Sequence, residues 1–419
     1  PAHLSPLSAY RQLSLASDVA PSSTVPMHEL HSILLEGFEK PRRQFRILPF
    51  PVVDKPDVSI VIPVHNKFDV TYLCLAAILF AASRATFEVI VVDDGSSDTT
   101  TKLPEIAPGT VYVRNETALG FVGACNAGAE KARGHYICFL NNDTEPTAHY
   151  LDELIFAFEN FEDVGLAGSK LIYPDGQLQE AGGIVWGSGD PWNYGRRANP
   201  FDPRYNYARV CDYVSGAAIM LPRTLWEEIG GFSREFMPAY FEDTDLAFKV
   251  KNAGKKVVYV PQSVVVHYEG MSNGTDQTAS SGLKRYQEIN RPKFKKKWAS
   301  LFGGNGKTGE NVDLAKDRGV SKRVLFLDYE VPQLDRDAGS YAAIQEIRMF
   351  QALGCKITFV PLNMAYMGRH TEFLQRMGVE TVYMPFSAGI ASFLQARGKE
   401  FDLVYITRYG VAEQTMNLV

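Results

Sequence analysis

The sequence Phe139-Leu140-Asn141-Asn142-Asp143 decides the fold class, because it turns abruptly from apolar to polar. The run Tyr136–Leu140 is short and partly aromatic and β-branched, a composition that predicts a buried β-strand. Asn and Asp directly after such a strand are typical of the carboxyl edge of an open α/β sheet, where ligands bind. An Asp carboxylate there can hold a hard divalent cation together with phosphate oxygens and water. The alternative is a plain strand-to-loop turn, in which Asn and Asp are also common.

The composition indicates a globular protein with more than one domain. The chain has 419 residues, of which 45% are hydrophobic and 22% charged, and this length allows two domains. The net charge of -5 argues against a general nucleic-acid-binding protein. The five cysteines have no Cys-x-x-Cys spacing, so we expect a reducing compartment and neither a zinc site nor a disulfide framework.

The sequence shows neither a membrane span nor a signal peptide. No apolar run approaches the roughly 18 residues that a span requires. Pro1–Leu4 lacks the charged-then-apolar order of a signal peptide. Because the chain also lacks an initiating Met, we expect it to be a piece of a longer protein.

Between residues 57 and 143 the chain alternates strands with helices. Strands are predicted over Val58–Pro63, Phe87–Val92 and Val111–Val113, before the strand that ends at Leu140. Helical spacing of apolar residues between them, with short connections, predicts right-handed crossovers and a parallel sheet. Every polar cluster follows a strand, so we expect the clusters to share one edge and to form the site.

The segment from residue 148 to residue 302 is less regular. We expect a helix over 148–161, strands over 164–173, 178–186 and 210–221, and two short strands over 257–260 and 264–267. The loop 187–209 is typical of a substrate loop or lid, and the Ser/Gly/Thr-rich segment 270–283 is expected to be mobile. The basic run 293–298 predicts a solvated helix face, with contact to anionic lipid headgroups as the alternative.

A second series of strands and helices begins at Ser321. Strands are predicted over 323–328, 356–360, 381–383 and 402–406, which would make half of a doubly wound domain. The series contains no Gly-x-Gly-x-x-Gly, so a dinucleotide site is not supported. We therefore expect an N-terminal extension or linker over 1–56 with a helix over 27–38, an α/β domain over 57–302, a linker over 303–320, and a partial Rossmann-like α/β domain over 321–419.

Four side chains at the expected edge are suited to chemistry: Asp94, Asp143, Asp243 and His267. Asp143 is the first candidate metal ligand and His267 the second, although a histidine after an apolar run is more often structural. Asp243 begins a predicted helix, where it suits either N-capping or the role of general base. Glu242 and Asp245 are alternatives for that base.

A series of motifs in this order resembles glycosyltransferase family 2. The motifs are Ser59–Asn66, Val91–Ser96, Asn115–Gly128, Leu140–Thr144, Glu242-Asp243-x-Asp245 and Val266–Gly270. The resemblance covers roughly residues 57–300 and is notable for the rhamnosyltransferase-like enzymes of bacterial surface polysaccharides. It implies an inverting, metal-dependent sugar transferase with the GT-A fold, an α/β fold with a mostly parallel central sheet.

Carried over position by position, the resemblance implies a nucleotide site. Pro63 and His65 would line the pocket of the base, Asp94 would bind the base or ribose, and Asn115 and Gly120 would flank the nucleotide.

The resemblance also implies a metal and a base. Asn142 and Asp143 occupy the family's Asp-x-Asp region, with Asp143 as the carboxylate that binds Mg²⁺ or Mn²⁺. His267 would be a further contact to the metal or the diphosphate, and Asp243 would be the general base. One departure is that Asn141 replaces the first carboxylate of the motif by an amide, which should weaken metal affinity.

The implied partners are a nucleotide-diphosphate sugar donor and a glycan or lipid-linked oligosaccharide acceptor of O-antigen or capsule type, with no nucleic acid. Rhamnose is the sugar that the subgroup suggests. The resemblance implies a cytoplasmic enzyme, with peripheral contact at the inner face of the cytoplasmic membrane. The sequence carries no indication of the oligomeric state.

Two alternatives remain open at this point. A catalytically silent GT-A module that binds glycan or scaffolds an assembly complex would also fit Asn141-Asn142-Asp143. A nucleotidyltransferase is less well supported, since no Gly-rich pyrophosphate loop follows the first strand. The segment from 321 resembles the N-terminal half of a GT-B transferase with its loop at 335–340, and we expect it to be inactive without the C-terminal half.

Overall fold

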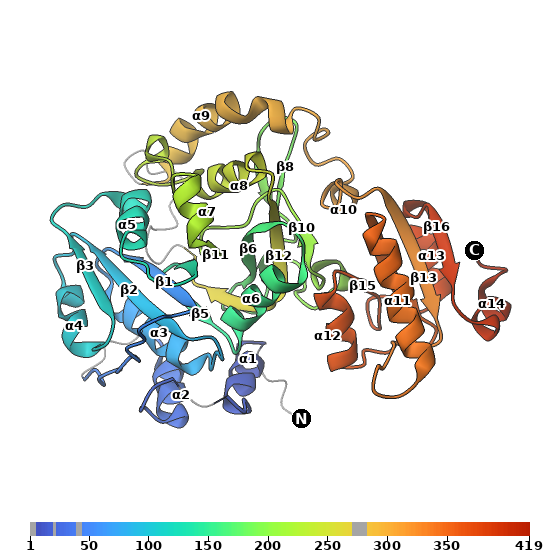
Figure 1. Ribbon diagram of the computed structural model, residues 1–419, viewed down its shortest axis with the longest axis horizontal. Helices are drawn as coiled ribbons and strands as arrows, with labels where there is room; N and C mark the ends of the chain where they lie inside the picture. Colours follow the sequence, from blue (N-terminus) through green and yellow to red (C-terminus); the bar gives the residue numbers. More distant parts are fainter. Residues whose placement is uncertain (1–5, 20–21, 39–43, 270–282) are drawn as a thin grey trace. The chain divides into compact units, whose positions relative to one another are not determined.

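The computed structural model describes residues 6–19, 22–38, 44–269 and 283–419, which form two compact units (Figure 1). The first unit is assigned residues 1–198, 211–259 and 263–308, and the second residues 199–210, 260–262 and 309–419. Residues 270–282 of the segment that we expected to be mobile lie outside the described residues.

The larger sheet is mixed, with the strand order β10-β12-β6-β11-β4-β1-β2-β3, β5 paired to β12 and β7 to β6. It belongs to the first unit except for β10 and residues 260–262 of β12. Its parallel part consists of β4 (Tyr136–Leu140), β1 (Val58–Val64), β2 (Phe87–Asp94) and β3 (Val111–Asn115). The remaining strands are β5 (Thr144–Pro146), β6 (Val164–Ile172), β7 (Leu178–Glu180), β10 (Arg209–Val210), β11 (Ala218–Pro222) and β12 (Lys256–His267). A separate hairpin pairs β8 (Gly183–Val185) with β9 (Pro191–Asn193). The predicted α/β fold and its parallel strands are confirmed.

Helices connect these strands and cover the sheet. The helices of this part are α3 (Phe68–Phe80), α4 (Leu103–Ile106), α5 (Gly120–Ala129), α6 (Tyr150–Asn160), α7 (Arg223–Glu228), α8 (Glu242–Asn252) and α9 (Arg285–Phe302). Since parallel neighbours need a crossover, α3 follows β1 and α5 follows β3. Gly128 lies where α5 meets the sheet, and a Cβ there would come within 2.5 Å of the Val61 side chain.

Three strand predictions were wrong in the antiparallel part. The strand predicted over 178–186 is divided into β7 and β8. The short strands predicted over 257–260 and 264–267 are one continuous strand, β12, because Pro261 interrupts the sequence pattern without ending the strand. The single strand predicted over 210–221 is divided into β10 and β11. The residues between them, 211–217, leave the sheet and reach the candidate site.

The N-terminal extension packs on the first unit through two helices, α1 (Pro6–Leu15) and α2 (Met27–Glu36). The helix predicted over 27–38 is confirmed as α2. Arg11 of α1 is 8% exposed and makes a bidentate contact with Glu145 of β5, at 2.7 Å from Nε and 2.8 Å from Nη2. The same Nη2 donates to the carbonyl oxygen of Leu34 in α2. The extension therefore supplies the counter-charge of a buried carboxylate.

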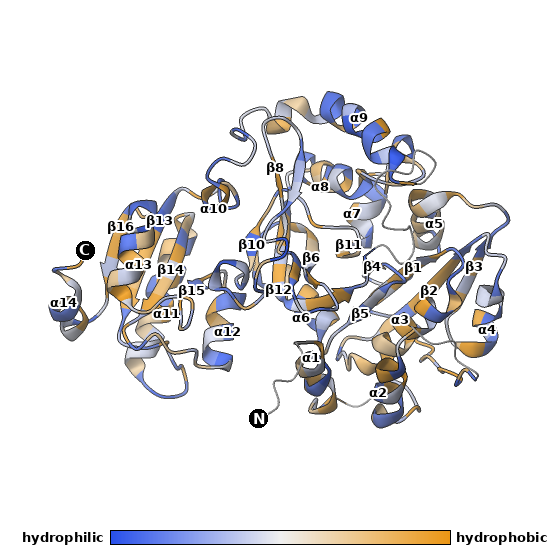
Figure 2. Cartoon of the chain, turned by 180° about the vertical axis from the view of Figure 1, so that it is seen from behind, coloured by the Kyte–Doolittle hydropathy of each residue, from blue (hydrophilic) through white to orange (hydrophobic). Residues whose placement is uncertain are grey.

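Helix α9 contains the basic run and is tied to its own unit. Figure 2 shows α9 as mainly hydrophilic, in contrast to the hydrophobic strands. Lys295 Nζ lies 2.9 Å from Asp190 Oδ1, and Lys297 Nζ lies 2.7 Å from Asp245 Oδ1. These ion pairs neutralise part of the charge that would attract lipid headgroups. Lys293 Nζ also donates to the carbonyl oxygen of Glu235 at 2.7 Å, so the prediction of a solvated face describes only part of the basic run. Of the helices in the described part of the chain, none is long and apolar enough to cross a bilayer.

The second unit has a parallel sheet in the order β15-β14-β13-β16. The strands are β13 (Lys322–Asp328), β14 (Cys355–Pro361), β15 (Glu380–Thr381) and β16 (Leu403–Ile406), and the helices are α10 (Val312–Ala315), α11 (Ala338–Ala352), α12 (Arg369–Arg376), α13 (Ile390–Arg397) and α14 (Tyr409–Thr415). Val324 and Phe326 belong to one hydrophobic cluster, and Leu325 and Leu327 to another. Because neighbouring residues in a strand face opposite sides, both faces of this sheet are covered.

Residues 199–210 belong to the second unit although they lie within the sequence of the first. Tyr207 Oη donates to Asp317 Oδ2 at 2.7 Å, and Tyr383 Oη donates to the carbonyl oxygen of Phe201 at 2.6 Å. Asp317 also pairs with Lys356, which in turn pairs with Glu380. The loop 187–209, expected to be one substrate loop, is thus divided between the two units.

We predict that Arg11→Met lowers the free energy of unfolding of the first unit by about 3–5 kcal/mol, because it leaves Glu145 buried and uncompensated. All four tryptophans, at 186, 192, 226 and 298, lie in the first unit, so tryptophan fluorescence during urea unfolding reports on it. The matched control is Arg84→Met, since the Arg84–Asp18 pair has side chains 68% and 85% exposed, and its loss should cost less than about 1 kcal/mol. Equal costs for the two variants would contradict the prediction.

Candidate active site

The carboxyl ends of the parallel strands bring four of the predicted nucleotide residues into one hydrogen-bonded network. Asp94, at the end of β2, accepts hydrogen bonds from Asn115 Nδ2 at 2.7 Å and from the backbone N–H of Gly120 at 2.7 Å. His65 Nδ1 lies 2.7 Å from the carbonyl oxygen of Asp94. Pro63 is the last residue but one of β1, beside Val92 of β2. Asp94 therefore shapes the loop that leads into α5.

Gly120 is required at its place in this loop. Its φ is +77°, and a Cβ there would lie 2.3 Å from Pro238 Cβ. A side chain would meet both a left-handed backbone and a collision. The backbone N–H of Gly120 can consequently approach the carboxylate of Asp94 closely.

The Asp143 and His267 side chains meet because β5 pairs with the end of β12. In this antiparallel pairing Thr144 lies opposite His267, and the backbone N–H of Tyr268 donates to the carbonyl oxygen of Asp143 at 2.9 Å. Asp143 Oδ1 is 3.3 Å from His267 Nε2, and both side chains are almost entirely buried. The sequence predicted both residues as metal ligands, and the structure brings them together.

The donor atoms at this point suit a hard divalent cation. Asn141 Oδ1 is buried and has no hydrogen-bond partner among the described residues. Carboxylate and amide oxygens are ligands that Mg²⁺ and Mn²⁺ accept, and imidazole suits Mn²⁺. Within the described ranges no group of three or more His, Cys, Asp or Glu side chains could hold a metal. The protein would therefore supply few ligands, and a bound diphosphate would have to supply others.

Asn142 is placed differently from its neighbours. It is 5% exposed, and its Nδ2 donates to Thr71 Oγ1 of α3 at 3.0 Å. Its amide packs the strand end against α3, whereas we expected it among the ligand-binding residues. The oxygen that is available at this motif belongs to Asn141.

Of the three carboxylates at the start of α8, Asp243 is the one that can act as a base. Asp245 is fully buried and bound to Ser233, Lys297 and Trp298. Glu242 is 8% exposed, its Oε2 has no hydrogen-bond partner among the described residues, and burial raises its pKa well above the ordinary value. Asp243 is partly exposed. Burial of its carboxylate raises the pKa of Asp243, and the N–H groups of Gly216 and Thr244 oppose that shift.

The segment that precedes β11 connects the base to the metal motif. The backbone N–H of Gly216 donates to Asp243 Oδ2 at 3.1 Å. The carbonyl oxygen of the next residue, Ala217, accepts from the backbone N–H of Asn141 at 2.9 Å. The two candidate groups are therefore held by adjacent residues of the turn that leads into β11.

Asn290 of α9 supports the approach to α8. It is fully buried, and its Nδ2 lies 3.0 Å from each of the carbonyl oxygens of Phe236, Ala239 and Tyr240. The residues just before Asp243 are fixed in this way by a helix that lies about 50 positions later in the sequence.

Sequence reasoning missed one residue beside His267. Gln179 of β7 is 3% exposed, and its Oε1 lies 3.1 Å from His267 Nδ1. No local motif could have revealed this contact, because 88 positions separate the two residues.

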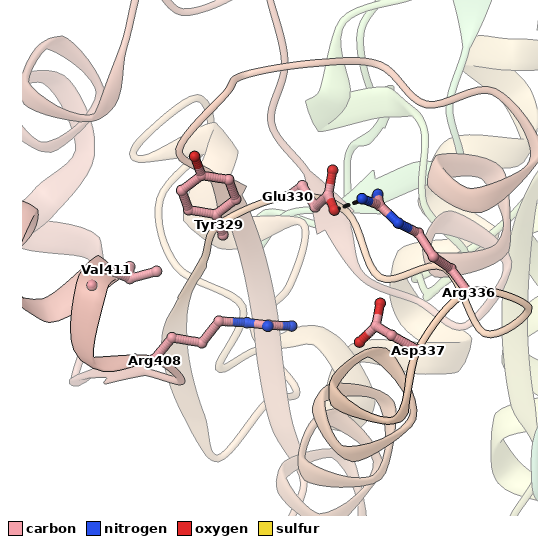
Figure 3. Close-up of a pocket in the computed structure, with 7 residues that line it drawn as sticks. Tyr329, Glu330, Arg336, Asp337, Arg408 and Val411 are labelled. Atoms are coloured by element: carbon pink, nitrogen blue, oxygen red, sulfur yellow. Dashed lines mark hydrogen bonds and ion pairs between the residues drawn. The ribbon is translucent and has the colours of Figure 1, made fainter.

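A second polar pocket of about 520 Å³ lies in the second unit, beside the ends of β13 and β16 (Figure 3). It is lined by Tyr329, Glu330, Arg336, Asp337, Arg408, Gly410 and Val411. Arg336 pairs with Glu330, and Arg408 pairs with Asp328 at 2.8 Å. Asp337 accepts a hydrogen bond from the backbone N–H of Ser340 at the start of α11. With both arginines paired to carboxylates, the pocket offers little excess positive charge to a diphosphate.

Comparison with known proteins gives a family match. Residues 59–225 match the model of "Glycosyl transferase family 2". The chain is 29% identical over 260 residues to an uncharacterized protein, y4gI, of Sinorhizobium fredii, and 30% identical over 243 residues to the O-antigen biosynthesis protein RfbC of Myxococcus xanthus. These matches cover 59% and 56% of this chain but only 28% and 19% of those proteins.

A third relative is nearer in length. It is the N-acetylglucosaminyl-diphospho-decaprenol L-rhamnosyltransferase of Mycobacterium tuberculosis, 26% identical over 231 residues. This match covers 48% of the chain and 73% of the relative.

We predict that Glu242→Gln stabilises the first unit increasingly as pH rises. The folded protein holds a proton on Glu242 at pH values where the unfolded chain, with a pKa of about 4.3, releases it. Wild-type stability should therefore fall, by up to about 1.4 kcal/mol per pH unit, as pH rises above about 4.3 towards the folded pKa. Urea unfolding between about pH 4 and 8, followed by tryptophan fluorescence, measures the difference. A difference that does not change with pH would contradict the prediction.

Proposed function

We propose that the first unit, whose residues 59–225 match the model of glycosyl transferase family 2, transfers a sugar, with inversion, from a nucleotide-diphosphate donor to a hydroxyl of a growing surface polysaccharide. The observation that carries this proposal is the segment Gly216-Ala217. It contacts Asp243 on one side and Asn141 of the metal motif on the other. A base for the acceptor and a cation site for the leaving diphosphate would thereby be held by the same turn, directly before β11.

The chemistry follows from these positions. The acceptor oxygen forms a bond to the anomeric carbon while the bond from that carbon to the diphosphate oxygen breaks. Asp243 takes the proton of the attacking hydroxyl, and its raised pKa improves it as a proton acceptor compared with an ordinary Asp. A single in-line displacement of this kind inverts the configuration at the anomeric carbon.

The donor would be held along the strand ends. His65, Asp94, Asn115 and Gly120 would take the nucleoside, and Asp143, His267 and Asn141 Oδ1 would hold Mg²⁺ or Mn²⁺. When bound, the cation neutralises charge on the departing diphosphate. Because Asn141 brings no negative charge, we expect the cation to bind weakly without the diphosphate.

The donor sugar and acceptor are proposed from the relatives. One of them is an O-antigen biosynthesis protein, and another is an N-acetylglucosaminyl-diphospho-decaprenol L-rhamnosyltransferase. We propose rhamnose on a nucleotide-diphosphate carrier as the donor and a glycan or lipid-linked oligosaccharide as the acceptor. Since the chain spans under a third of the first relatives, the reaction of the whole protein is part of the same proposal.

We predict that one nucleoside diphosphate binds in a Mn²⁺-dependent manner and that Asp143→Ala weakens this binding at least 10-fold. Isothermal titration with a panel of nucleoside diphosphates, with and without Mn²⁺, measures the affinity. Arg408→Ala in the second pocket is the control and should leave the affinity unchanged, since that pocket lacks excess positive charge. If no nucleotide binds to the wild type, the silent glycan-binding module is the better description.

We predict that Asp243→Asn leaves nucleotide affinity within a few-fold and lowers the rate of sugar transfer by about 10²–10⁴-fold. Transfer from a radiolabelled donor to a hydroxyl acceptor measures the rate. Glu228→Gln, an exposed carboxylate of α7, is the matched control and should retain the wild-type rate. Transfer by Asp243→Asn at the wild-type rate would exclude Asp243 as the base.

A further inference from the structure

The two ring nitrogens of His267 face groups of different kinds. Nε2 is 3.3 Å from Asp143 Oδ1, and Nδ1 is 3.1 Å from Gln179 Oε1. A neutral imidazole has one N–H donor and one lone-pair acceptor, and the hydrogen bond at one nitrogen decides the role of the other. The orientation of the Gln179 amide therefore determines which atom of His267 faces Asp143.

The orientation of this amide is determined by Glu269. Gln179 Nε2 donates to Glu269 Oε2 at 3.3 Å, and a carboxylate can only accept. The same carboxylate accepts a hydrogen bond from Tyr173 Oη at 2.9 Å and pairs with Arg196 at 3.2 Å. If the amide were turned over, its oxygen would face the carboxylate and its NH₂ would face the histidine. The charge of Glu269 thus keeps Gln179 Oε1 directed at His267.

The consequence for His267 follows from donor and acceptor complementarity. Gln179 Oε1 is an acceptor, so Nδ1 must carry the hydrogen. In the neutral ring Nε2 is then a lone pair directed at the Asp143 carboxylate, another acceptor. Two acceptors at 3.3 Å repel each other unless a cation or a proton lies between them. Metal-binding histidines commonly donate their other N–H to a fixed oxygen, as His267 does to Gln179, and this favours the cation.

We propose that Gln179 is a positioning residue, which holds His267 in the Nδ1–H form so that Nε2 and Asp143 together face a divalent cation. The proposal rests on the function proposed above for the cation, although its first test needs no substrate. Gln179 lies on β7, a three-residue strand, and contacts the Nδ1 side of the His267 ring. Its effect on the cation would therefore be indirect, through His267.

The test compares Gln179→Met, which keeps the length of the side chain but removes the acceptor, with Gln177→Met. Gln177 is exposed and lies two positions earlier in the sequence. Proteins with ¹⁵N-labelled histidine are examined by NMR without metal at a pH where the ring is neutral, and His267→Asn assigns the signal. We expect the Nδ1–H form in wild type and Gln177→Met, and a shift towards the Nε2–H form in Gln179→Met.

The second measurement is the affinity for Mn²⁺ alone, by electron paramagnetic resonance. Gln179→Met should bind Mn²⁺ about 10–100-fold more weakly than wild type and Gln177→Met, as is usual when the partner of a metal-binding histidine is lost. Thermal unfolding shows whether the variant is folded.

The two measurements separate the possible failures. A His267 ring that is doubly protonated or in the Nε2–H form in the wild type would overturn the proposal, as would a Gln179→Met variant with unchanged tautomer. A tautomer that changes while Mn²⁺ affinity stays the same would overturn the link to the cation. Failure of the transferase function would instead appear as absent sugar transfer with both of these results as expected.

Discussion

The site depends on the pairing of a three-residue strand, β5, with the end of β12. This pairing sets Thr144 opposite His267 and brings together two side chains that lie 124 positions apart in the chain. So short a strand has few hydrogen bonds of its own, and a buried ion pair supports it. Arg11 of the N-terminal extension holds Glu145, whose carboxylate also accepts a hydrogen bond from Tyr268 Oη. Residues on both sides of the Asp143–His267 contact are therefore fixed by a helix that precedes the matched residues 59–225.

The three carboxylates in the first turn of α8 have different electrostatic environments. At its start, Glu242 and Asp243 are carboxylates whose pKa values burial raises, which costs folding free energy. Within the same turn, Asp245 is held by Lys297 and Trp298 of α9. The anchored carboxylate of Asp245 fixes the helix, and the ionised form of Asp243, the candidate base, remains destabilised by burial. Active sites commonly retain such a cost, because the group that is unfavourable for stability is the one that performs the chemistry.

The sequence was sufficient to predict the parallel half of the sheet and which residues lie at its edge. Apolar runs that end in Asn, Asp or His predicted β1, β2 and β4 and their shared edge, because each signal is local. Contacts between distant segments were not predictable. The pairing of Arg11 with Glu145 spans 134 positions, and that of Gln179 with His267 spans 88. The sequence around Arg11 or around Gln179 contains no local signal that identifies the residue each one contacts. The split of residues 187–209 between two units was also beyond local reasoning, since loop composition does not show which core the tyrosines enter.

Residues 199–210 belong to the second unit but are translated before most of it, and this affects folding during translation. These residues leave the ribosome about 110 to 180 positions before the partners that contact them, which include Asp317, Gln375 and Tyr383. At 5–20 residues per second, residues 199–210 wait for roughly 5–40 s before these partners have been synthesised. If the first unit folds during this interval, residues 199–210 have not yet formed their contacts with the second unit. The two units are therefore not consecutive in the sequence. A fragment that begins at residue 309 would lack residues 199–210, which belong to the second unit.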